Sequence, residues 1–164
     1  MPVDASFSLS GDEVRRIGAH LSREEATEVY LPLSRLLYLH VSATQGLYRA
    51  AGAFLAEEEK EVPYVIGIAG SVAAGKSTVA EVLRALISRW PSRPEVALVS
   101  TDGFIYPNRV LQSRGLMERK GFPESYDVAL LLRFLADVKS GREGVSAPIH
   151  STLPTTSSPI ENRS

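Results

Sequence analysis

The decisive stretch of this sequence is Val65-Ile66-Gly67-Ile68-Ala69-Gly70-Ser71-Val72-Ala73-Ala74-Gly75-Lys76-Ser77-Thr78. Its first five residues, 65–69, form a short apolar run with β-branched side chains, which predicts a buried strand. The next eight, 70–77, fit G-x-x-x-x-G-K-[ST], the pattern of a phosphate-binding P-loop. The run 78–87 then has the composition of a helix. Strand, loop and helix follow one another in the order that a P-loop requires.

The residue types of this loop suit the phosphate groups of a nucleotide. Gly70 and Gly75 let the backbone turn tightly, so that its N–H groups approach phosphate oxygens. The start of the following helix adds unpaired N–H groups and a partial positive charge. Lys76 can reach the β- and γ-phosphates, and the Ser77 hydroxyl is an oxygen ligand of the kind that Mg²⁺ prefers. We predict an ATP site at Gly70, Ser71, Val72, Ala73, Ala74, Gly75, Lys76, Ser77 and Thr78; the alternative is a chance glycine-rich turn.

Length and composition indicate one modest domain, and the order of strand, loop and helix makes its class α/β. The chain has 164 residues, of which 44% are hydrophobic and 23% charged, as in an ordinary soluble protein. The net charge of −1 does not suggest a nucleic-acid partner. Cysteine is absent, which excludes disulfides and thiolate chemistry. We see no signal peptide and no apolar run that would span a bilayer, and we expect a cytoplasmic protein without a membrane partner.

The first sixty residues predict an N-terminal helical segment. Ser10-Gly11-Asp12-Glu13 and Ser22-Arg23-Glu24-Glu25 both have the spacing of a capping box. Apolar residues at helical intervals then predict one helix over 26–41 and another over about 44–59. Pro32 is expected near a helix start. The charged run 57–60 would be a solvated boundary.

A second candidate strand covers 96–100 and ends at Thr101-Asp102-Gly103-Phe104. Ligands bind beyond the carboxyl ends of the strands in an open parallel sheet, and Asp102 follows such an end. Its carboxylate could accept a proton from a substrate hydroxyl, or hold Mg²⁺ through water. The alternative is an ordinary turn residue in an Asp-Gly pair, and the spacing alone does not decide between them.

The remainder of the chain contains a loop-rich basic stretch, a helix and a tail. Arg109, Arg114, Arg119 and Lys120 would face either phosphates or, more simply, solvent. Tyr126-Asp127 precedes a predicted helix over 128–139, which Gly141 ends. Residues 152–164 are low in complexity, which predicts a disordered tail.

Several blocks of sequence, taken together, resemble bacterial type I pantothenate kinase, a P-loop kinase related to uridine kinase and phosphoribulokinase. The matching blocks, which run from about Leu21 to His150, are residues 30–37, 68–78, 101–104, 107–108, 120–127, 139–141 and 147–148. The P-loop is common to many families, whereas the other blocks are not.

The resemblance implies ATP-dependent phosphorylation of pantothenate, the first step of coenzyme A synthesis. It makes Lys76 the key cation of the ATP loop and Asp102 the catalytic base, with ATP and Mg²⁺ as cofactors. It also implies a homodimer and feedback inhibition by coenzyme A. Relatives carry a basic residue where this chain has Glu81, which puts coenzyme A inhibition in doubt here.

The resemblance covers only the N-terminal half of such a kinase and stops at Ser151. We therefore predict a helical segment over 1–60, the N-terminal part of the kinase core with an incomplete parallel sheet over 61–151, and a tail over 152–164. Read two bases later, synonymous codons for 151–161 can spell His-Leu-Ala-Tyr-Asp-Ile-Val-Pro-Asp, which is similar to the family's continuation. The tail is thus predicted to be out-of-frame translation, the alternative being a true terminus of a shortened relative.

Two other functions stay open at this stage. One is a nucleotide-binding fragment without catalysis, which the missing half favours. The other is a P-loop kinase for another small substrate, such as a nucleoside.

Overall fold

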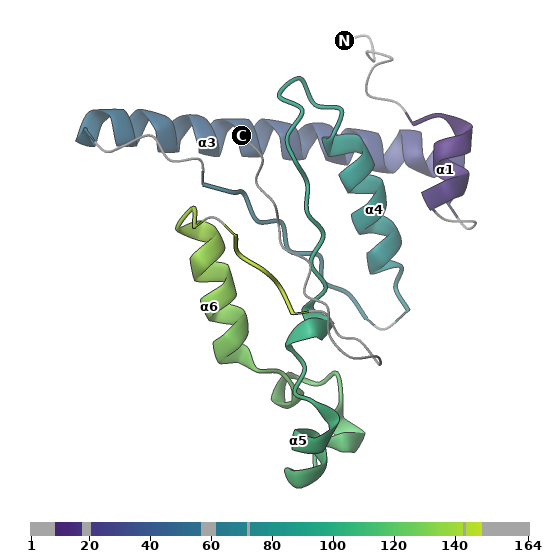
Figure 1. Cartoon of the computed structure of the whole chain (residues 1–164). Coiled ribbons are helices and arrows are strands. Elements are labelled where there is room, and N and C mark those ends of the chain that lie inside the picture. Colours follow the sequence, from purple (N-terminus) through teal and green to yellow (C-terminus); the bar gives the residue numbers. More distant parts are fainter. Residues whose placement is uncertain (1–8, 18–20, 57–61, 72, 143, 149–164) are drawn as a thin grey trace. The chain divides into compact units, whose positions relative to one another are not determined.

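The computed structural model describes residues 9–17, 21–56, 62–71, 73–142 and 144–148 (Figure 1). The described part of the chain forms two compact units, each of which is considered by itself. The first contains described residues of Met1–Glu59 and Tyr64–Leu98, and the second those of Lys60–Pro63 and Val99–Ser164. The tail predicted over 152–164 lies outside the described residues. The predicted division into three domains remains a prediction.

The first unit begins with helices whose caps agree with the sequence. Helix α1 covers Gly11–Ile17, and the Ser10 hydroxyl accepts a hydrogen bond from the Glu13 backbone N–H at 3.4 Å, while the Glu13 carboxylate accepts from the Ser10 N–H at 2.9 Å. This reciprocal pair is the predicted capping box. Ser22 caps the short helix α2, Arg23–Glu25, by accepting from the Glu25 N–H at 2.9 Å. A π-helical turn, η2, covers Ala26–Tyr30 and leads into α3.

Helix α3 corrects the prediction of two separate helices over 26–41 and 44–59. It is one continuous helix of 25 residues, Leu31–Leu55, with Pro32 in its first turn as expected. Residues 42–45 contain neither glycine nor proline, so nothing in the backbone interrupts the helix there. The helix ends where Ala56 takes the left-handed conformation with a φ of 52°.

Helix α4, Lys76–Ile87, contributes buried side chains to both clusters that form the core of the first unit. Its buried side chains Val82 and Leu86 belong to a cluster with residues of the N-terminal helices, and Leu83 and Ile87 belong to a second cluster with Trp90. Two neighbouring stripes of one helix therefore face two parts of the core. The apolar residues of the first cluster outside α4 are Leu9, Val14, Leu21, Ala26 and Leu31.

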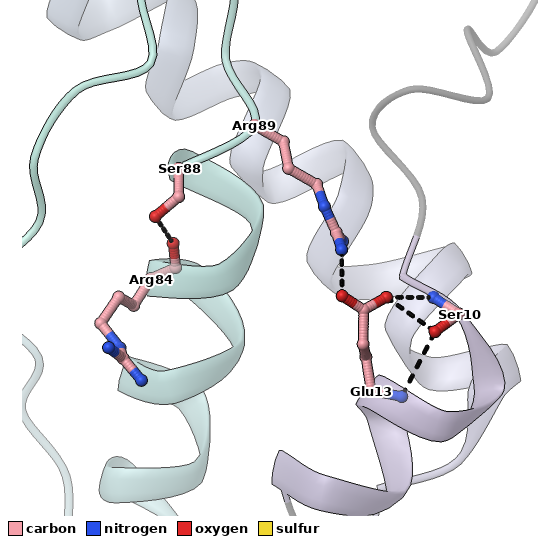
Figure 2. A network of polar contacts seen from close by, with 5 residues as sticks. All are labelled: Ser10, Glu13, Arg84, Ser88 and Arg89. Atoms are coloured by element: carbon pink, nitrogen blue, oxygen red, sulfur yellow. Dashed lines mark hydrogen bonds and ion pairs between the residues drawn. The ribbon is translucent and has the colours of Figure 1, made fainter.

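A salt bridge joins α1 to the turn after α4. Arg89 pairs with the carboxylate of Glu13, which also accepts a hydrogen bond from the Ser10 hydroxyl at 2.7 Å (Figure 2). The Ser88 hydroxyl donates to the carbonyl of Arg84 at 2.8 Å and so closes the last turn of α4. The helix cap of α1 and the end of α4 are thus held by one polar network.

The two predicted strands are not formed in the described residues. Segments 62–70 and 93–100 contain no helix and no strand. Ile68 and Val96 pack against the cluster around Leu83, as inward-facing strand residues would, whereas Val65 and Ile66 are exposed. A strand requires hydrogen bonds to a neighbouring strand, and the described chain does not provide such a ladder. The parallel sheet is therefore not confirmed.

The second unit is built from short helices around Phe104. Its elements are the 3₁₀ turn η3 (Thr101–Phe104), helix α5 (Asn108–Ser113), the 3₁₀ turns η4 (Met117–Arg119) and η5 (Pro123–Ser125), and helix α6 (Val128–Lys139). An isolated antiparallel bridge pairs Ile105 with Tyr126, and the Phe104 and Phe134 rings lie 5.4 Å apart. The bounds of α6 confirm the prediction over 128–139. No helix in the described ranges has both the length and the apolar character needed to cross a membrane.

Candidate functional site

The described residues of the P-loop form a turn that leads into α4, as predicted. The Lys76 ammonium folds back over the loop and donates hydrogen bonds to the carbonyls of Gly70 at 2.9 Å and Ser71 at 2.8 Å. Ala73 and Gly75 take left-handed φ angles of 61° and 73°. Glycine adopts such an angle without strain, which explains Gly75, whereas the left-handed Ala73 has no signal in the sequence. Val72 lies outside the described residues.

The start of α4 leaves room for an anion. Gly75 precedes the helix and has no side chain with which to cap it. The first intrahelical hydrogen bond runs from the Val79 N–H to the Gly75 carbonyl at 3.0 Å, so the N–H groups of Lys76, Ser77 and Thr78 come before the helical ladder. Such groups, together with the helix dipole, favour negative charge.

Ser77, which the sequence predicts to be a magnesium ligand, is accessible at the start of α4. Its side chain is in the first turn of α4, two residues after Gly75, and the residue is exposed. No group of three or more His, Cys, Asp or Glu side chains in the described ranges could hold a metal ion. Mg²⁺ beside a nucleotide keeps several waters and is otherwise bound by phosphate oxygens and one or two protein ligands. The Ser77 hydroxyl would therefore suffice as the protein's ligand in this part of the site.

Asp102 lies in the second unit, in the first turn of η3. Its backbone N–H donates to the Ser100 hydroxyl at 3.2 Å, and its carbonyl accepts from the Ile105 N–H at 3.1 Å. These bonds fix the backbone of the turn, and the residue itself is exposed. The P-loop belongs to the first unit and Asp102 to the second, and each is described within its own unit.

Gly103, beside Asp102, is required by a close approach that sequence reasoning missed. A Cβ atom at this position would lie 1.8 Å from the carbonyl oxygen of Pro148 and 2.9 Å from its carbonyl carbon. Only a hydrogen atom fits there. The Asp102 turn is thus packed against a segment 45 positions later, and the one signal in the sequence was that Ala147-Pro148 formed a block of the family resemblance.

The basic residues after Asp102 are engaged within their own unit. Arg114 lies over the Tyr106 ring, 4.4 Å from its centroid, and Arg119 pairs with Glu124. Lys120 donates to the side-chain carbonyl of Asn108 at 3.1 Å. Arg114 and Arg119 are both exposed, in agreement with the solvent-facing interpretation, and each also makes a contact within its unit.

The cavity found in the second unit is distinct from either predicted site. It has a volume of about 360 Å³ and lies between α6 and the segment after it. Its lining includes Phe104, Arg133, Phe134, Asp137, Arg142 and Pro148. Glu81 lies on α4 and pairs with Arg84, whose Nη2 is 2.6 Å from the Glu81 carboxylate.

Comparison with known proteins finds bacterial pantothenate kinases that match most of this chain. No family model matches the chain. The pantothenate kinase of Parvibaculum lavamentivorans is 58% identical over 140 residues, which cover 85% of this chain and 43% of that protein. The pantothenate kinase of Xanthobacter autotrophicus is 55% identical over 157 residues, or 90% of this chain and 49% of that protein. The one from Brevibacillus brevis is 58% identical over 133 residues, or 81% and 42%.

The resemblance to bacterial pantothenate kinases is thereby confirmed. The chain spans somewhat less than half the length of the curated relatives it matches, consistent with their N-terminal half.

Proposed function

We propose that this chain is the ATP-binding half of a pantothenate kinase, which transfers the γ-phosphoryl group of ATP to the terminal hydroxyl of pantothenate at the first step of coenzyme A synthesis. The observation that carries the proposal is the identity of 54–58% to curated pantothenate kinases over more than four fifths of the chain. The open start of α4 and the position of Lys76 support a site for the phosphates of ATP.

The proposed reaction assigns a separate task to each side chain. The Asp102 carboxylate accepts the proton of the substrate hydroxyl while that oxygen bonds to the γ-phosphorus. The bond from the γ-phosphorus to the β–γ bridging oxygen breaks, and ADP leaves with its electron pair. Lys76 exchanges its two carbonyl partners for phosphate oxygens and balances the charge that develops on them. Bound Mg²⁺ supplies further charge neutralisation, with Ser77 as its protein ligand.

The parallel sheet belongs to the same proposal. Segments 65–69 and 96–100 become strands when neighbouring strands are present, because a parallel sheet is buried on both faces by the elements around it. The exposure of Val65, Ile66, Leu98 and Val99 supports this, since β-branched and large apolar side chains favour such burial.

The chain of 164 residues by itself is expected to bind ATP and to transfer little phosphate, which is the second candidate function. Its coverage of 42–49% of the first three relatives favours this. Transfer depends on positioning both substrates, and the matched region accounts for less than half of each of these relatives. A nucleoside as substrate has less support, because each of these relatives is a pantothenate kinase.

The expected partners extend the proposal. The kinase would act in the cytoplasm as a homodimer. Inhibition by coenzyme A would be weak, because Glu81 places a carboxylate where relatives have a cation, and its pairing with Arg84 neutralises it only in part.

A chimeric enzyme tests the function. The chain up to Ser151, joined to the remaining half of the Parvibaculum relative, is expected to consume ATP only when pantothenate is added. Asp102→Asn should keep ATP binding and lose roughly 100-fold or more in kcat, because an amide cannot accept the hydroxyl proton. Calorimetry with ATP beside a turnover assay separates the two. An equal loss of ATP binding and turnover would instead make Asp102 a structural turn residue, and turnover with a nucleoside but not pantothenate would refute the assignment of substrate.

A further inference from the structure

The Asp102 carboxylate is not held by any other side chain among the described residues. It forms no hydrogen bond or ion pair there, and the residue is exposed in the first turn of η3. A carboxylate that accepts a proton from a substrate must lie within hydrogen-bond reach of that proton. The direction of this side chain is therefore set by the backbone of its turn, and by the contacts that fix that backbone.

The end of the turn after Asp102 is fastened to the rest of the second unit. Phe104 is 1% exposed, and its carbonyl accepts a hydrogen bond from the Asp127 N–H at 2.8 Å. The Tyr106 N–H donates to the Ser125 carbonyl at 2.9 Å. Packing and two backbone hydrogen bonds thus hold this end of η3, and neither bond involves a side-chain atom.

The middle of the turn is held by the close approach of Gly103 to Pro148. A Cβ atom on Gly103 would lie 1.8 Å from the Pro148 carbonyl oxygen, which leaves the turn no room to move in that direction. The atoms in closest approach belong to the backbone of both residues. No side-chain deletion can therefore loosen this contact, and an added methyl group would disrupt it.

The beginning of the turn is held by a side chain, that of Ser100. Its hydroxyl accepts a hydrogen bond from the Asp102 N–H at 3.2 Å, and its carbonyl accepts from the Gly103 N–H at 3.4 Å. Ser100 has extended backbone angles, with φ at −82° and ψ at 130°, and so takes the position of an N-cap for η3. The hydroxyl therefore acts on the peptide group of Asp102 itself.

We infer that Ser100 is a positioning residue for Asp102. By holding the Asp102 N–H, the hydroxyl fixes the orientation of that peptide group and, through it, the direction of the Cα–Cβ bond that carries the carboxylate. Without the hydroxyl, the start of the turn would take other orientations, and the carboxylate would lie less often within reach of a substrate hydroxyl. The inference rests on the proposed function, in which Asp102 is the base. Ser100 itself takes no part in the proton transfer.

The chimera of this chain with the remaining half of the Parvibaculum relative tests the inference through kcat. Ser100→Ala should lower kcat roughly 10-fold and leave the KM for ATP within about twofold, because the P-loop is unaltered. Ser100→Thr, which keeps a hydroxyl at the same place, should restore kcat to within about threefold of wild type. Ser113→Ala is the matched control and should keep the wild-type kcat. It removes a hydroxyl that donates to the Val110 carbonyl at 2.9 Å in α5 of the same unit.

A double-mutant cycle with Asp102→Asn separates positioning from a general effect on the fold. In the Asp102→Asn background, Ser100→Ala should cost less than about twofold in the residual kcat, because misplacing an amide that cannot accept the proton loses nothing further. A Ser100 that only supported the fold would lower the turnover by the same factor in both backgrounds.

Amide hydrogen exchange in the 164-residue chain tests the contact without any turnover. The Asp102 N–H should exchange roughly 10-fold faster in Ser100→Ala than in the wild type, because its protection depends on the hydroxyl acceptor. In Ser100→Thr it should exchange at nearly the wild-type rate. The Leu130 N–H, which donates to the Asp127 carboxylate, is the internal reference and should be unchanged.

The outcomes distinguish this inference from the proposed function. A loss of kcat in Ser100→Ala that Ser100→Thr reverses, and that disappears beside Asp102→Asn, supports the inference. A wild-type kcat in Ser100→Ala, equal losses in both backgrounds, or unchanged exchange of the Asp102 N–H would overturn it and leave Asp102 as the base. Full turnover by Asp102→Asn alone would instead refute the assignment of the base, and the inference with it.

Discussion

The helices α4 and α6 have the same length of 12 residues, but they begin in opposite ways. Helix α6 is closed by its own chain: the Asp127 carboxylate accepts from the Leu130 N–H at 2.9 Å, and the Asp127 N–H donates to the Phe104 carbonyl at 2.8 Å. Helix α4 begins after Gly75, which provides no cap. A helix start that lacks an internal acceptor is the one that can take an external anion.

The same contrast extends to the surroundings of each helix start. The start of α6 is hydrogen-bonded to the η3 turn, which is packed tightly, with Gly103 against Pro148 and Phe104 against Phe134. The loop before α4 is exposed, and its internal hydrogen bonds from Lys76 can be exchanged for bonds to a ligand. The start of α6 is capped by residues of the chain itself, whereas the start of α4 is left open for a ligand. The following predictions test that difference.

The largest effect is expected at the open helix start. Lys76→Ala should weaken binding of ATP with Mg²⁺ to the chain by roughly 30- to 100-fold, since hydrogen bonds to a charged group contribute about 1.5–3 kcal/mol each. Isothermal titration calorimetry measures it. Arg84→Ala, which removes a cation from the same helix, is the control and should bind ATP almost normally. Unchanged affinity of the Lys76→Ala protein would show that the open start of α4 is not a phosphate site.

The next effect concerns the tightly packed turn. Gly103→Ala should lower the free energy of unfolding by about 1–3 kcal/mol, because its Cβ cannot coexist with the Pro148 carbonyl oxygen. Gly52→Ala is the matched control, because a Cβ there meets nothing within 4 Å inside α3, and it should stabilise by about 0.5–1 kcal/mol. Urea denaturation compares the two. Effects of the same sign at both positions would contradict the packing.

A smaller effect is expected at the closed helix start. Asp127→Ala should cost about 1 kcal/mol by leaving the Leu130 N–H without its cap, and Asp127→Asn only a few tenths, since an amide oxygen also accepts. Denaturant midpoints measure both. If the two substitutions cost the same, the charge of Asp127 rather than its hydrogen bond would be the stabilising feature.

Local signals explain which parts of this fold were predictable. The bounds of α6 follow from its cap at Asp127 and the left-handed Gly141 at its end, and the capping box at Ser10 was visible for the same reason. The P-loop was visible because its glycines and Lys76 act within a few residues of one another. These features depend on neighbours in sequence, and sequence patterns record such neighbours directly.

Features that depend on distant neighbours were missed or wrongly predicted. The contact of Gly103 with Pro148 has no local pattern, because the two residues lie 45 positions apart in the sequence. The apolar runs at 65–69 and 96–100 indicated strands, but a strand also requires a partner that the described residues do not supply. The break predicted before Thr44 was wrong, since helical φ and ψ angles continue wherever no residue forbids them.

The smallest effect is expected at a third helix start, that of α1, which is closed like α6. The pKa of Glu13 is lowered to about 2, first by the hydrogen bond from the Ser10 N–H, then by the Ser10 hydroxyl and by Arg89 (Figure 2). A carboxyl group whose pKa is lower in the folded than in the unfolded chain stabilises the fold above its unfolded value of 4.5, and this contribution is lost as the pH falls toward 2. Because the side chain is 33% exposed, solvent screening reduces the effect to about 1 kcal/mol or less.

Glu13→Gln isolates that contribution. Its melting temperature should lie below that of the wild type at pH 7, and the difference should shrink by pH 3 and vanish only below pH 2, where the wild-type carboxylate is itself mostly protonated. Asp12→Asn is the matched control: Asp12 pairs with Arg15 on the exposed face of the same helix, with its side chain 75% exposed, and should shift the melting temperature little at any pH. A constant difference between Glu13→Gln and wild type across this range would mean that α1 is closed by the geometry of Glu13 alone. In that case the charge of Glu13 would not be what closes the start of α1. Its contrast with the start of α4, which Gly75 leaves open for a charged ligand, would then not be one of charge.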